Sequence, residues 1–233
     1  MTFLEKLLFP PHCVLCGASG HWPGKLLDLC PPCRADLPIL GVACQRCGEV
    51  ITTAGVCGSC LHQPPPQRFL VAPFRYQFPV DHLITGLKFH NRLHFAPLLG
   101  ILLADHLREN YLLPGTIQLP EQLLPVPLHS SRLRQRGYNQ ALELARALGK
   151  SLGIPLETRL CQRTRATAAQ SGLDAYARIA NVRGAFAVTG TPRAKRIAIV
   201  DDVVTTGHTV AALAQALLDA GVGEVQVWAV ARA

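Results

Sequence analysis

The chain has 233 residues, a formal net charge of +8, and a composition in which 49% of the residues are hydrophobic. This apolar content and a mean hydropathy of +0.22 exclude global disorder, and the length fits one medium domain with a small appendage. The positive charge lies entirely beyond residue 66, where it suits phosphate-bearing partners, although a solvated basic surface would look the same.

The first residues, Met1–Phe9, have neither a basic start nor a small-residue cleavage site, and two prolines follow them directly. These features argue against a secretory signal peptide, and the longest apolar run of the chain is too short to span a membrane. We therefore expect a soluble, cytoplasmic protein without membrane insertion.

Eight of the nine cysteines form four Cys-x-x-Cys pairs near the start of the chain. Two residues between thiolates allow one tight turn to aim both sulfurs at a tetrahedral ion. Two structural Zn²⁺ sites therefore explain the pattern better than disulfides or a redox motif. Shorter loops favour sequential pairing, and a crossed arrangement stays open. The predicted ligands are Cys13, Cys16, Cys30 and Cys33 for one ion and Cys44, Cys47, Cys57 and Cys60 for the other.

The cysteine count is complete without the neighbouring His12, His21 and His62, which we interpret as bystanders. The ninth cysteine, Cys161, is interpreted as a small apolar residue. Eight thiolates on two Zn²⁺ ions would lower the net charge to about +4. The pattern leaves open whether this zinc ribbon contacts nucleic acid, a protein or only its own chain.

A stiff, proline-rich break at Gln63–Pro66 separates the cysteines from the rest of the chain. Beyond it, short apolar strands alternate with amphipathic helices. The predicted strands are 69–76, 122–128, 196–200 and 225–230, and the predicted helices are 80–89, 95–111, 138–152 and 209–220. We expect a double zinc ribbon over 1–63 and an α/β domain over 67–233, with a parallel sheet flanked by helices and ligands beyond the carboxyl ends of its strands.

The most informative segment joins the predicted strand 196–200 to the predicted helix 209–220. The strand delivers two adjacent carboxylates, Asp201 and Asp202, and a hydroxyl-rich turn with Gly207 then opens the helix. Backbone N–H groups of such a turn and a helix N-terminus form a concave anion site, and carboxylates suit vicinal sugar hydroxyls with Mg²⁺ nearby. The alternative is a strand end with an aspartate helix cap.

The ordered series of apolar run, acidic pair, Thr-Thr-Gly turn and helix resembles the signature of the type I phosphoribosyltransferases. The resemblance implies an α/β core that binds 5-phosphoribosyl-1-pyrophosphate together with Mg²⁺. It also implies that Asp201 and Asp202 hold the ribose hydroxyls and that Val204–Thr209 bind the 5-phosphate. The residues of that predicted phosphate loop are Val204, Thr205, Thr206, Gly207, His208 and Thr209.

The stretch Val126–Gln140, the Gly86–Phe89 motif and the stretch Thr164–Phe186 with Thr167, Gln170, Arg178 and Asn181 resemble the ComF/GntX family, as does the cysteine ribbon in front of them. The resemblance covers essentially the whole chain. It implies a zinc ribbon fused to a phosphoribosyltransferase domain and a part in natural transformation and the use of incoming single-stranded DNA. In the GntX branch the name comes from gluconate uptake.

By this resemblance, the residues after the strand 122–128 stand where a phosphoribosyltransferase keeps its pyrophosphate loop. Arg132, Arg134 and Arg136 there suit a diphosphate through paired N–H donors, and we assign catalysis to Arg134 and Arg136 with Asp201 and Asp202. A solvated basic helix start is the alternative.

Two further basic groups are more ambiguous. Arg163, Arg165 and Arg178 fit a mobile lid over the diphosphate or an ordinary surface loop. For the cluster at the end of the helix 80–89, compensation of the helix dipole is the favoured interpretation. That cluster consists of Lys88, His90, Arg92 and His94. His129 has no assigned task.

The resemblance implies phosphoribosyl transfer, with an oxocarbenium-like ribose and arginines and Mg²⁺ on the departing diphosphate, if the protein turns over. No base and no acceptor pocket can be identified from the sequence. The alternative is a non-catalytic module that uses the phosphate site as a sensor and binds single-stranded DNA or proteins of the DNA-uptake machinery. Aromatic residues make up 6% of the chain, which argues against an extended base-stacking platform.

Overall fold

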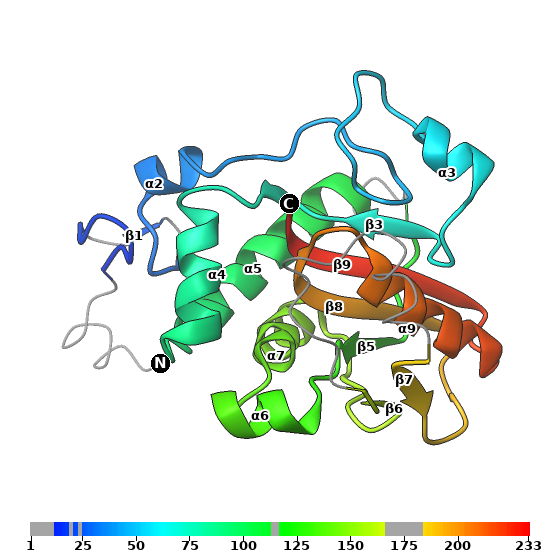
Figure 1. The fold of residues 1–233 in the computed structure, drawn as a ribbon. Coiled ribbons are helices and arrows are strands. Elements are labelled where there is room, and N and C mark those ends of the chain that lie inside the picture. Colours follow the sequence, from blue (N-terminus) through cyan, green and yellow to red (C-terminus); the bar gives the residue numbers. More distant parts are fainter. Residues whose placement is uncertain (1–11, 19–20, 23–24, 113–116, 166–183) are drawn as a thin grey trace.

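The computed structural model describes residues 12–18, 21–22, 25–112, 117–165 and 184–233. Its centre is a sheet in the order β3-β9-β8-β5, with β4 also on β9, and all of these pairings are parallel. The strands are β3 (Phe69–Val71), β4 (Phe74–Arg75), β5 (Gln122–Pro125), β8 (Arg196–Val204) and β9 (Glu224–Arg232). The predicted parallel sheet is confirmed, with β8 and β9 as its long central strands (Figure 1).

Helices cover both faces of this sheet, as predicted (Figure 1). Ala198 and Val200 of β8 share one core with three helices, and the alternate residues Ile197 and Ile199 share the other core with a single helix. The three helices are α4 (Val80–Phe89), α5 (Phe95–Leu107) and α7 (Gln140–Leu152), and the single helix is α9 (His208–Asp219).

Several elements differ from their predicted lengths for local reasons. The predicted strand 69–76 is divided into β3 and β4 before Pro73, which has no N–H to donate to a ladder. The predicted helix 95–111 changes after Leu107 into the π-helical turn η1 (Arg108–Leu112). β8 extends to Val204, so the two carboxylates lie within the strand rather than after it.

Three elements beside the sheet, one helix and two strands, were not predicted. The helix α6 (Ser130–Arg136) carries the three arginines and ends at Gly137, whose φ of +82° is the left-handed conformation that glycine adopts readily. The strands β6 (Cys161–Arg163) and β7 (Phe186–Val188) form an antiparallel pair. Four of the residues that carried the family resemblance, Thr167, Gln170, Arg178 and Asn181, lie outside the described residues.

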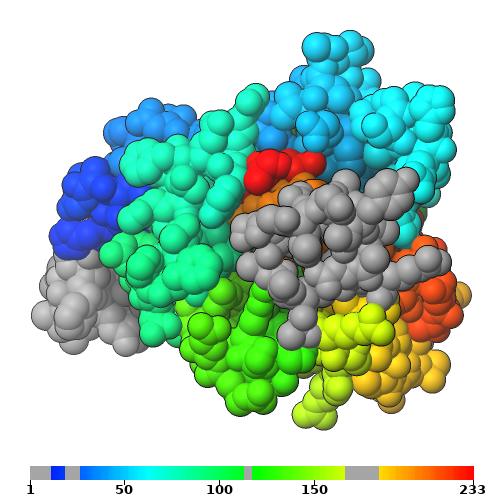
Figure 2. Space-filling model, in the orientation of Figure 1, coloured from blue at the N-terminus to red at the C-terminus, as the bar shows by residue number. Residues whose placement is uncertain are grey.

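The cysteine-rich segment contains the strands β1 (His21–Trp22) and β2 (Lys25–Leu26) and the short helices α2 (Pro31–Ala35) and α3 (Gly58–His62). Its first half belongs to the core of α4 and α5 through Leu29 and Leu37, and its second half contributes Leu40 to the opposite core. The two halves consequently lie on different sides of the molecule, in blue and in cyan in Figure 2. Among the described residues, no helix combines the length and the apolar character needed to cross a bilayer.

Candidate functional site

The acid pair lies near the carboxyl end of β8, with the two side chains directed differently. Asp202 is almost fully buried and Asp201 is partly buried. An oxygen of Asp201 accepts a hydrogen bond from the backbone N–H of Asp202 at 2.9 Å. Because successive residues of a strand face opposite sides, Asp202 can contact the helices of one face while Asp201 faces the loop that follows.

Asp202 forms an ion pair with Lys88, the penultimate residue of α4. The ammonium nitrogen lies 2.6 Å from Oδ2 of Asp202, and the two side chains are 21% and 3% exposed. Burial lowers the pKa of Lys88, but the attraction of Asp202, with a smaller part from Asp201, outweighs it and leaves the pKa raised. Lys88 is therefore a charged component of this site, and the interpretation that it compensates a helix dipole is not needed.

Among the described residues, no ion pair of Asp201 is seen. Its burial, and then the negative charge of Asp202, raise its pKa well above the ordinary value of an aspartate, and Lys88 only partly opposes this. Hydrogen-bond donors or a cation brought in with a ligand would stabilise the charged form of such a carboxylate. In the described part of the chain, the acid pair thus combines one ion-paired carboxylate with one whose pKa is raised.

The loop after β8 forms a small hollow that Asp201 also lines. The cavity of about 40 Å³ is bordered by Asp201, Val203 and the residues up to Val210, and it has about three times the roughly 10–15 Å³ that one water needs. Gly207 adopts a φ of +78° as the residue that opens α9. The first hydrogen bond of α9 joins Ala211 N–H to the Gly207 carbonyl, which leaves the preceding amides free of helical acceptors. This is an anion-binding geometry.

The side chains of the loop add polar groups to these amides. Thr205 and Thr206 are exposed, and the hydroxyl of Thr206 lies 3.1 Å from Nδ1 of His208. Thr209 is half-buried in the first turn of α9. The predicted phosphate loop and the acid pair therefore lie together at the carboxyl end of the central strand β8.

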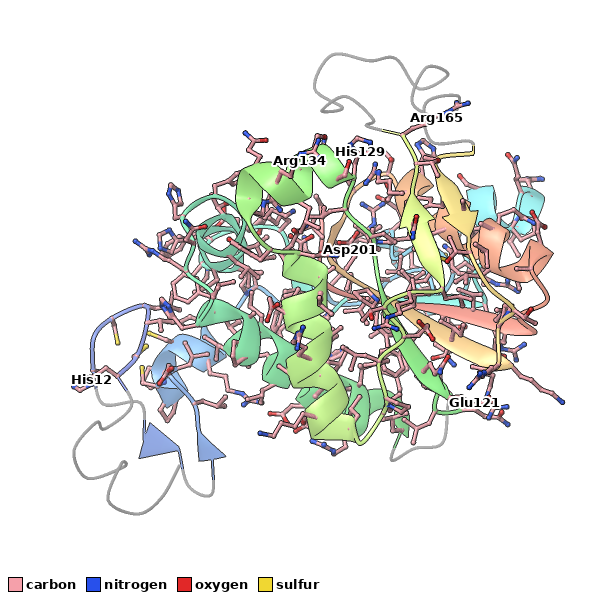
Figure 3. The ribbon with its side chains drawn as sticks, turned by 90° about the horizontal axis from the view of Figure 1, so that it is seen from below. His12, Glu121, His129, Arg134, Arg165 and Asp201 are labelled. Carbon is pink, nitrogen blue, oxygen red and sulfur yellow. The ribbon has the colours of Figure 1, made fainter. Side chains whose placement is uncertain are left out.

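The three arginines of α6 have different surroundings. The guanidinium of Arg136 lies 5.3 Å from the centre of the Phe89 ring and donates to the side chain of Gln140. Its pKa is lowered by burial, and the attraction of Asp202 partly opposes this. Arg136 therefore faces the acid pair, whereas Arg134 is exposed and lies at the outer surface of α6 (Figure 3).

The third arginine, Arg132, acts electrostatically on Arg163 of β6. Burial lowers the pKa of Arg163, the positive charge of Arg132 lowers it further, and Asp201 opposes both effects. The guanidinium of Arg163 lies 5.5 Å from the ring centre of Phe186 in the paired strand β7. Arg163 is partly buried, while Arg165, two residues after the end of β6, is exposed.

Capping hydrogen bonds fix the N-terminal ends of α6 and α7. His129 caps α6 by accepting from the N–H of Ser131 at 3.3 Å, and Asn139 caps α7 while its amide donates to the Val126 carbonyl at 3.0 Å. The hydroxyl of Tyr138 donates to the Leu87 carbonyl, next to Lys88. The polar segment between β5 and α7 is therefore anchored to both its strand and α4.

Two cavities of about 520 and 650 Å³ lie apart from the hollow beside Asp201. One of about 520 Å³ is lined by Arg163, Tyr138, Leu133 and neighbouring residues of α6, α7 and β6. It has the volume of a small-molecule site. Another of about 650 Å³ lies between the second cysteine group and β3, away from Asp201.

The cysteines gather in two sequential groups of four, the pairing that shorter loops favoured. Within each group the sulfur atoms all lie within 4.8 Å of one another. Cys16 and Cys30 are 3.6 Å apart and Cys47 and Cys57 are 3.7 Å apart, close to the edge of about 3.8 Å that a tetrahedron of Zn–S bonds of about 2.3 Å requires. Both distances are far longer than the roughly 2.05 Å of a disulfide bond, so the arrangement fits zinc ligation.

Backbone N–H donors lower the pKa of one cysteine in each group. Burial opposes the ionisation of Cys13, but N–H donors, first that of Cys30, outweigh it and lower the pKa to about 6. Cys44 behaves in the same way, with a pKa of about 6, and the N–H of Cys57 lies 3.2 Å from its sulfur. Since zinc binds the thiolate, both groups fit structural Zn²⁺, and neither includes a histidine.

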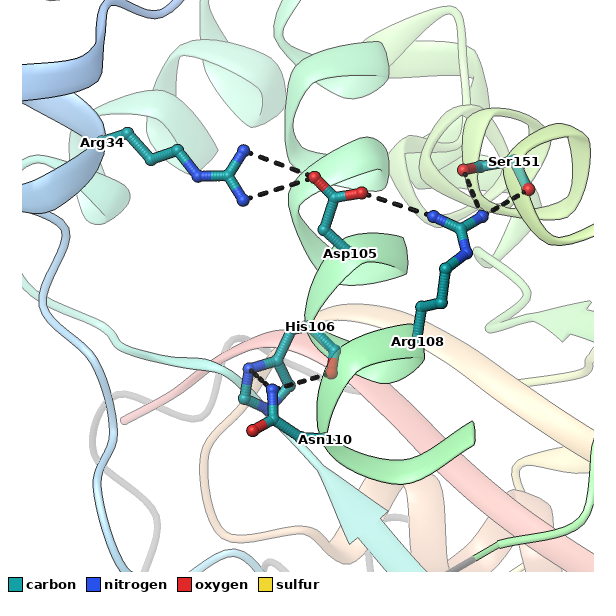
Figure 4. Close-up of polar contacts among 6 residues, drawn as sticks. All are labelled: Arg34, Asp105, His106, Arg108, Asn110 and Ser151. Carbon is teal, nitrogen blue, oxygen red and sulfur yellow. Dashed lines mark hydrogen bonds and ion pairs between the residues drawn. The ribbon is translucent and has the colours of Figure 1, made fainter. Parts of the chain in front are cut away.

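An ion pair with a buried carboxylate links the first cysteine group to the helix α5 (Figure 4). Both terminal nitrogens of Arg34, next to Cys33, lie 3.3 Å from one oxygen of Asp105 in α5. The other oxygen of Asp105 lies 3.4 Å from Arg108, which also donates to the Ser151 carbonyl at 2.8 Å.

Comparison with known proteins shows similarity over both parts of the chain. A double zinc ribbon domain model matches residues 4–61. DNA utilization protein YhgH of Escherichia coli is 37% identical over 230 residues, covering 97% of this chain and 99% of that protein. The Salmonella typhimurium protein of the same name is 36% identical, with the same coverage. Competence protein F of Haemophilus influenzae is 35% identical, covering 95% and 97% of the two chains.

Among solved structures, a purine phosphoribosyltransferase from Pyrococcus horikoshii is similar at 19% identity with a TM-score of 0.33. The similarity covers 58% of this chain and 80% of that chain.

Proposed function

Because the chain belongs to the family of DNA utilization protein YhgH and competence protein F, we propose that it binds 5-phosphoribosyl-1-pyrophosphate with Mg²⁺ at Asp201–Thr209 and acts in the use of incoming DNA. The membership agrees with the resemblance of the sequence to the ComF/GntX family. The observation that carries the proposal is the shared hollow, in which Asp201 borders the same cavity as the amides of the phosphate loop.

Each part of the site has a role in this proposal. The amides before Ala211 and the hydroxyls of Thr205 and Thr206 bind the 5-phosphate. Asp201, which borders the hollow, accepts hydrogen bonds from the ribose hydroxyls, while Asp202 beside it is paired with Lys88. Donors from the sugar stabilise the charged form of Asp201, which burial and Asp202 disfavour. When bound with the diphosphate, Mg²⁺ supplies charge neutralisation on its oxygens.

The basic residues around the acid pair hold the diphosphate. Asp202 and Asp201 act favourably on the positive charges of Arg136 and Arg163 respectively, and we assign both arginines to the diphosphate. Their planar N–H donors suit phosphate oxygens. Lys88 compensates the buried carboxylate of Asp202 through their ion pair. In phosphoribosyl transfer these cations stabilise the negative charge of the departing pyrophosphate.

Isothermal titration of the zinc-loaded chain with phosphoribosyl pyrophosphate and Mg²⁺ tests the proposal. We expect binding by the wild type and its loss in Asp201→Asn/Asp202→Asn. Asp219→Asn at the far end of α9 is the matched control and should bind like the wild type, since Asp219 accepts a hydrogen bond from Gln215 of its own helix and lies at the opposite end of α9 from the phosphate loop. Equal heats of binding for the wild type and the double variant would contradict a binding site at Asp201–Thr209.

A second candidate function is the binding of single-stranded DNA. Arg134 and Arg165 are exposed at the same end of the molecule, with His129 between them and Asp201 deeper inside (Figure 3). Such cations bind phosphates of any sequence, and their affinity falls steeply with salt. Filter binding of a labelled oligonucleotide should show retention at low salt that weakens in Arg134→Ala/Arg165→Ala. No retention at low salt would exclude this function.

A further inference from the structure

The second cysteine group lies directly against the carboxyl end of β9. The carbonyl of Cys47 accepts a hydrogen bond from Nε of Arg232 at 3.2 Å, and Glu49 forms an ion pair with the same guanidinium at 2.9 Å. Arg232 is the last residue of β9, and its side chain is only 12% exposed. A cysteine turn near the start of the chain is thus held by a residue at its end.

The same guanidinium reaches the start of the phosphate loop. Another of its nitrogens lies 3.4 Å from the carbonyl of Val204, and the N–H of Ala233 donates to that carbonyl at 3.0 Å. Val204 pairs with Arg232 in the parallel register of β8 and β9, and it borders the hollow next to Thr205. Two donors from the end of the chain therefore fix the carbonyl at which β8 turns into the loop.

The cysteine turn lies close to both Leu70 and Arg232. Gly48 follows Cys47 with a φ of +73°, and a Cβ atom there would lie 2.7 Å from Leu70 and 3.4 Å from the side chain of Arg232. Leu70 thus limits the movement of the turn, and the arginine lies within van der Waals reach of it. The direct link between the turn and the guanidinium is the pair of contacts with the Cys47 carbonyl and Glu49.

We propose that Arg232 is a positioning residue that couples the zinc-loaded second cysteine group to the sugar-phosphate loop. The proposal rests on the proposed function of that loop. With the four thiolates held by the ion, the Cys47 carbonyl and Glu49 keep the guanidinium in place, and the guanidinium holds the Val204 carbonyl. The first cysteine group is different, because in the described part of the chain its Arg34 pairs with Asp105 in α5, on the other side of the sheet from the α9 core.

Titration of the zinc-loaded full chain tests this coupling with two probes, ribose 5-phosphate and Mg²⁺-pyrophosphate. In Arg232→Gln we expect the affinity for ribose 5-phosphate to fall about tenfold, a loss within the range of a charged hydrogen bond. Binding of pyrophosphate should not change, since Arg136 and Arg163 do not contact Arg232 in the hydrogen bonds of the described residues. General destabilisation would weaken both probes.

The matched control is Arg34→Gln, which removes the corresponding ion pair of the first cysteine group. It should lower the thermal stability but leave both affinities at the wild-type value. If Arg232→Gln binds ribose 5-phosphate as tightly as the wild type, the coupling is wrong. If the wild type binds neither ribose 5-phosphate nor phosphoribosyl pyrophosphate, the proposed function fails instead.

Amide hydrogen exchange decides the coupling without any ligand. Exchange in the segment 203–209 should be faster in zinc-loaded Arg232→Gln than in the wild type. Removal of zinc from the wild type should accelerate the same segment, and removal from Arg232→Gln should add little there. Unchanged exchange of this segment in Arg232→Gln, or additive effects of zinc removal and substitution, would overturn the inference.

Discussion

The ion pair between Lys88 and Asp202 is the shortest ion pair among the described residues, at 2.6 Å with Asp202 almost fully buried. A charge buried at this depth is tolerated because its partner is present. Without that partner, the carboxylate keeps the full penalty of leaving water. Lys88 at the end of α4 is therefore the residue that lets β8 carry a buried carboxylate at position 202.

Lys88→Met is expected to destabilise the folded chain by about 3–5 kcal/mol, because it leaves an unpaired buried carboxylate. The double variant Lys88→Met/Asp202→Asn should recover most of this loss. Urea unfolding of the wild type, both single variants and the double variant measures the coupling between the two residues. Additive losses in the double variant would show that the pair is not linked.

Asp201 should affect stability in the opposite direction. Its pKa is raised in the folded chain, first by burial and then by Asp202, so the folded state binds the proton more tightly than the unfolded state. Its contribution is therefore favourable at a pH below the ordinary aspartate value of about 3.9 and is lost as the pH rises towards the folded pKa.

Asp201→Asn should consequently raise Tm at neutral pH by about 2–4 °C, as a gain of about 1 kcal/mol does in a chain of this size. The gain should shrink as the pH is lowered towards 4. Differential scanning calorimetry at several pH values provides the measurement, with Asp219→Asn as the control. A gain that grows on acidification would contradict the raised pKa.

Among the elements, α5 and α7 approach each other backbone to backbone at Gly100. Gly100 of α5 faces α7 so closely that a Cβ atom would lie 2.8 Å from Ala147 and 3.0 Å from the Leu144 carbonyl. The backbone of α7 cannot yield to it as the end of a flexible side chain could. Since α7 packs against β8, this crossing also supports the sheet that carries the acid pair.

Gly100→Ala is expected to lower the free energy of unfolding by about 1–3 kcal/mol through overpacking. Gly190→Ala is the matched control, because Gly190 has open space around it and no positive φ. Equilibrium denaturation of both variants gives the comparison. Equal stability of Gly100→Ala and the wild type would mean that the two helices separate at no cost.

The helices were the elements that the sequence predicted best. The structure gives α4 its predicted bounds, and α7 begins only two residues after its predicted start, where Asn139 caps it. Local periodicity and caps determine such helices. Two other features depend on pairing with distant residues, which periodicity does not reveal. They are the division of the predicted strand 69–76 into two strands on β9 and the antiparallel pairing of β6 with β7.

The acid pair and its loop were predicted from consecutive residues, because a strand, two carboxylates and a turn follow one another in the chain. Lys88 and Arg232 were not identified as parts of this region. Both reach it from elements far away in the sequence, and a lysine at a helix end gives no local sign of the carboxylate it meets. The register of β8 on β9 and the position of α4 over the sheet supply that information.

At the scale of the whole molecule, the two cysteine groups are built into opposite cores. The first contributes Cys13, Cys30 and Leu37 to the core of α4 and α5, and the second reaches the core of α9 through Leu40. The buried pair of Arg34 and Asp105 adds a polar link on the first side. Each predicted zinc ion therefore stabilises a segment that covers one face of the sheet.

Removal of zinc should lower the Tm of the entire chain, because structural zinc contributes folding free energy directly and both cores lose packed residues with it. Calorimetry with and without a strong chelator should show the unfolding of α4, α5 and the sheet at a lower temperature. Asp105→Asn should reduce the part of this shift that the first site supplies, since Arg34 then loses its charged partner. If α4, α5 and the sheet unfold at the same temperature after complete zinc removal, the zinc ribbon is thermodynamically independent of the sheet and this prediction is wrong.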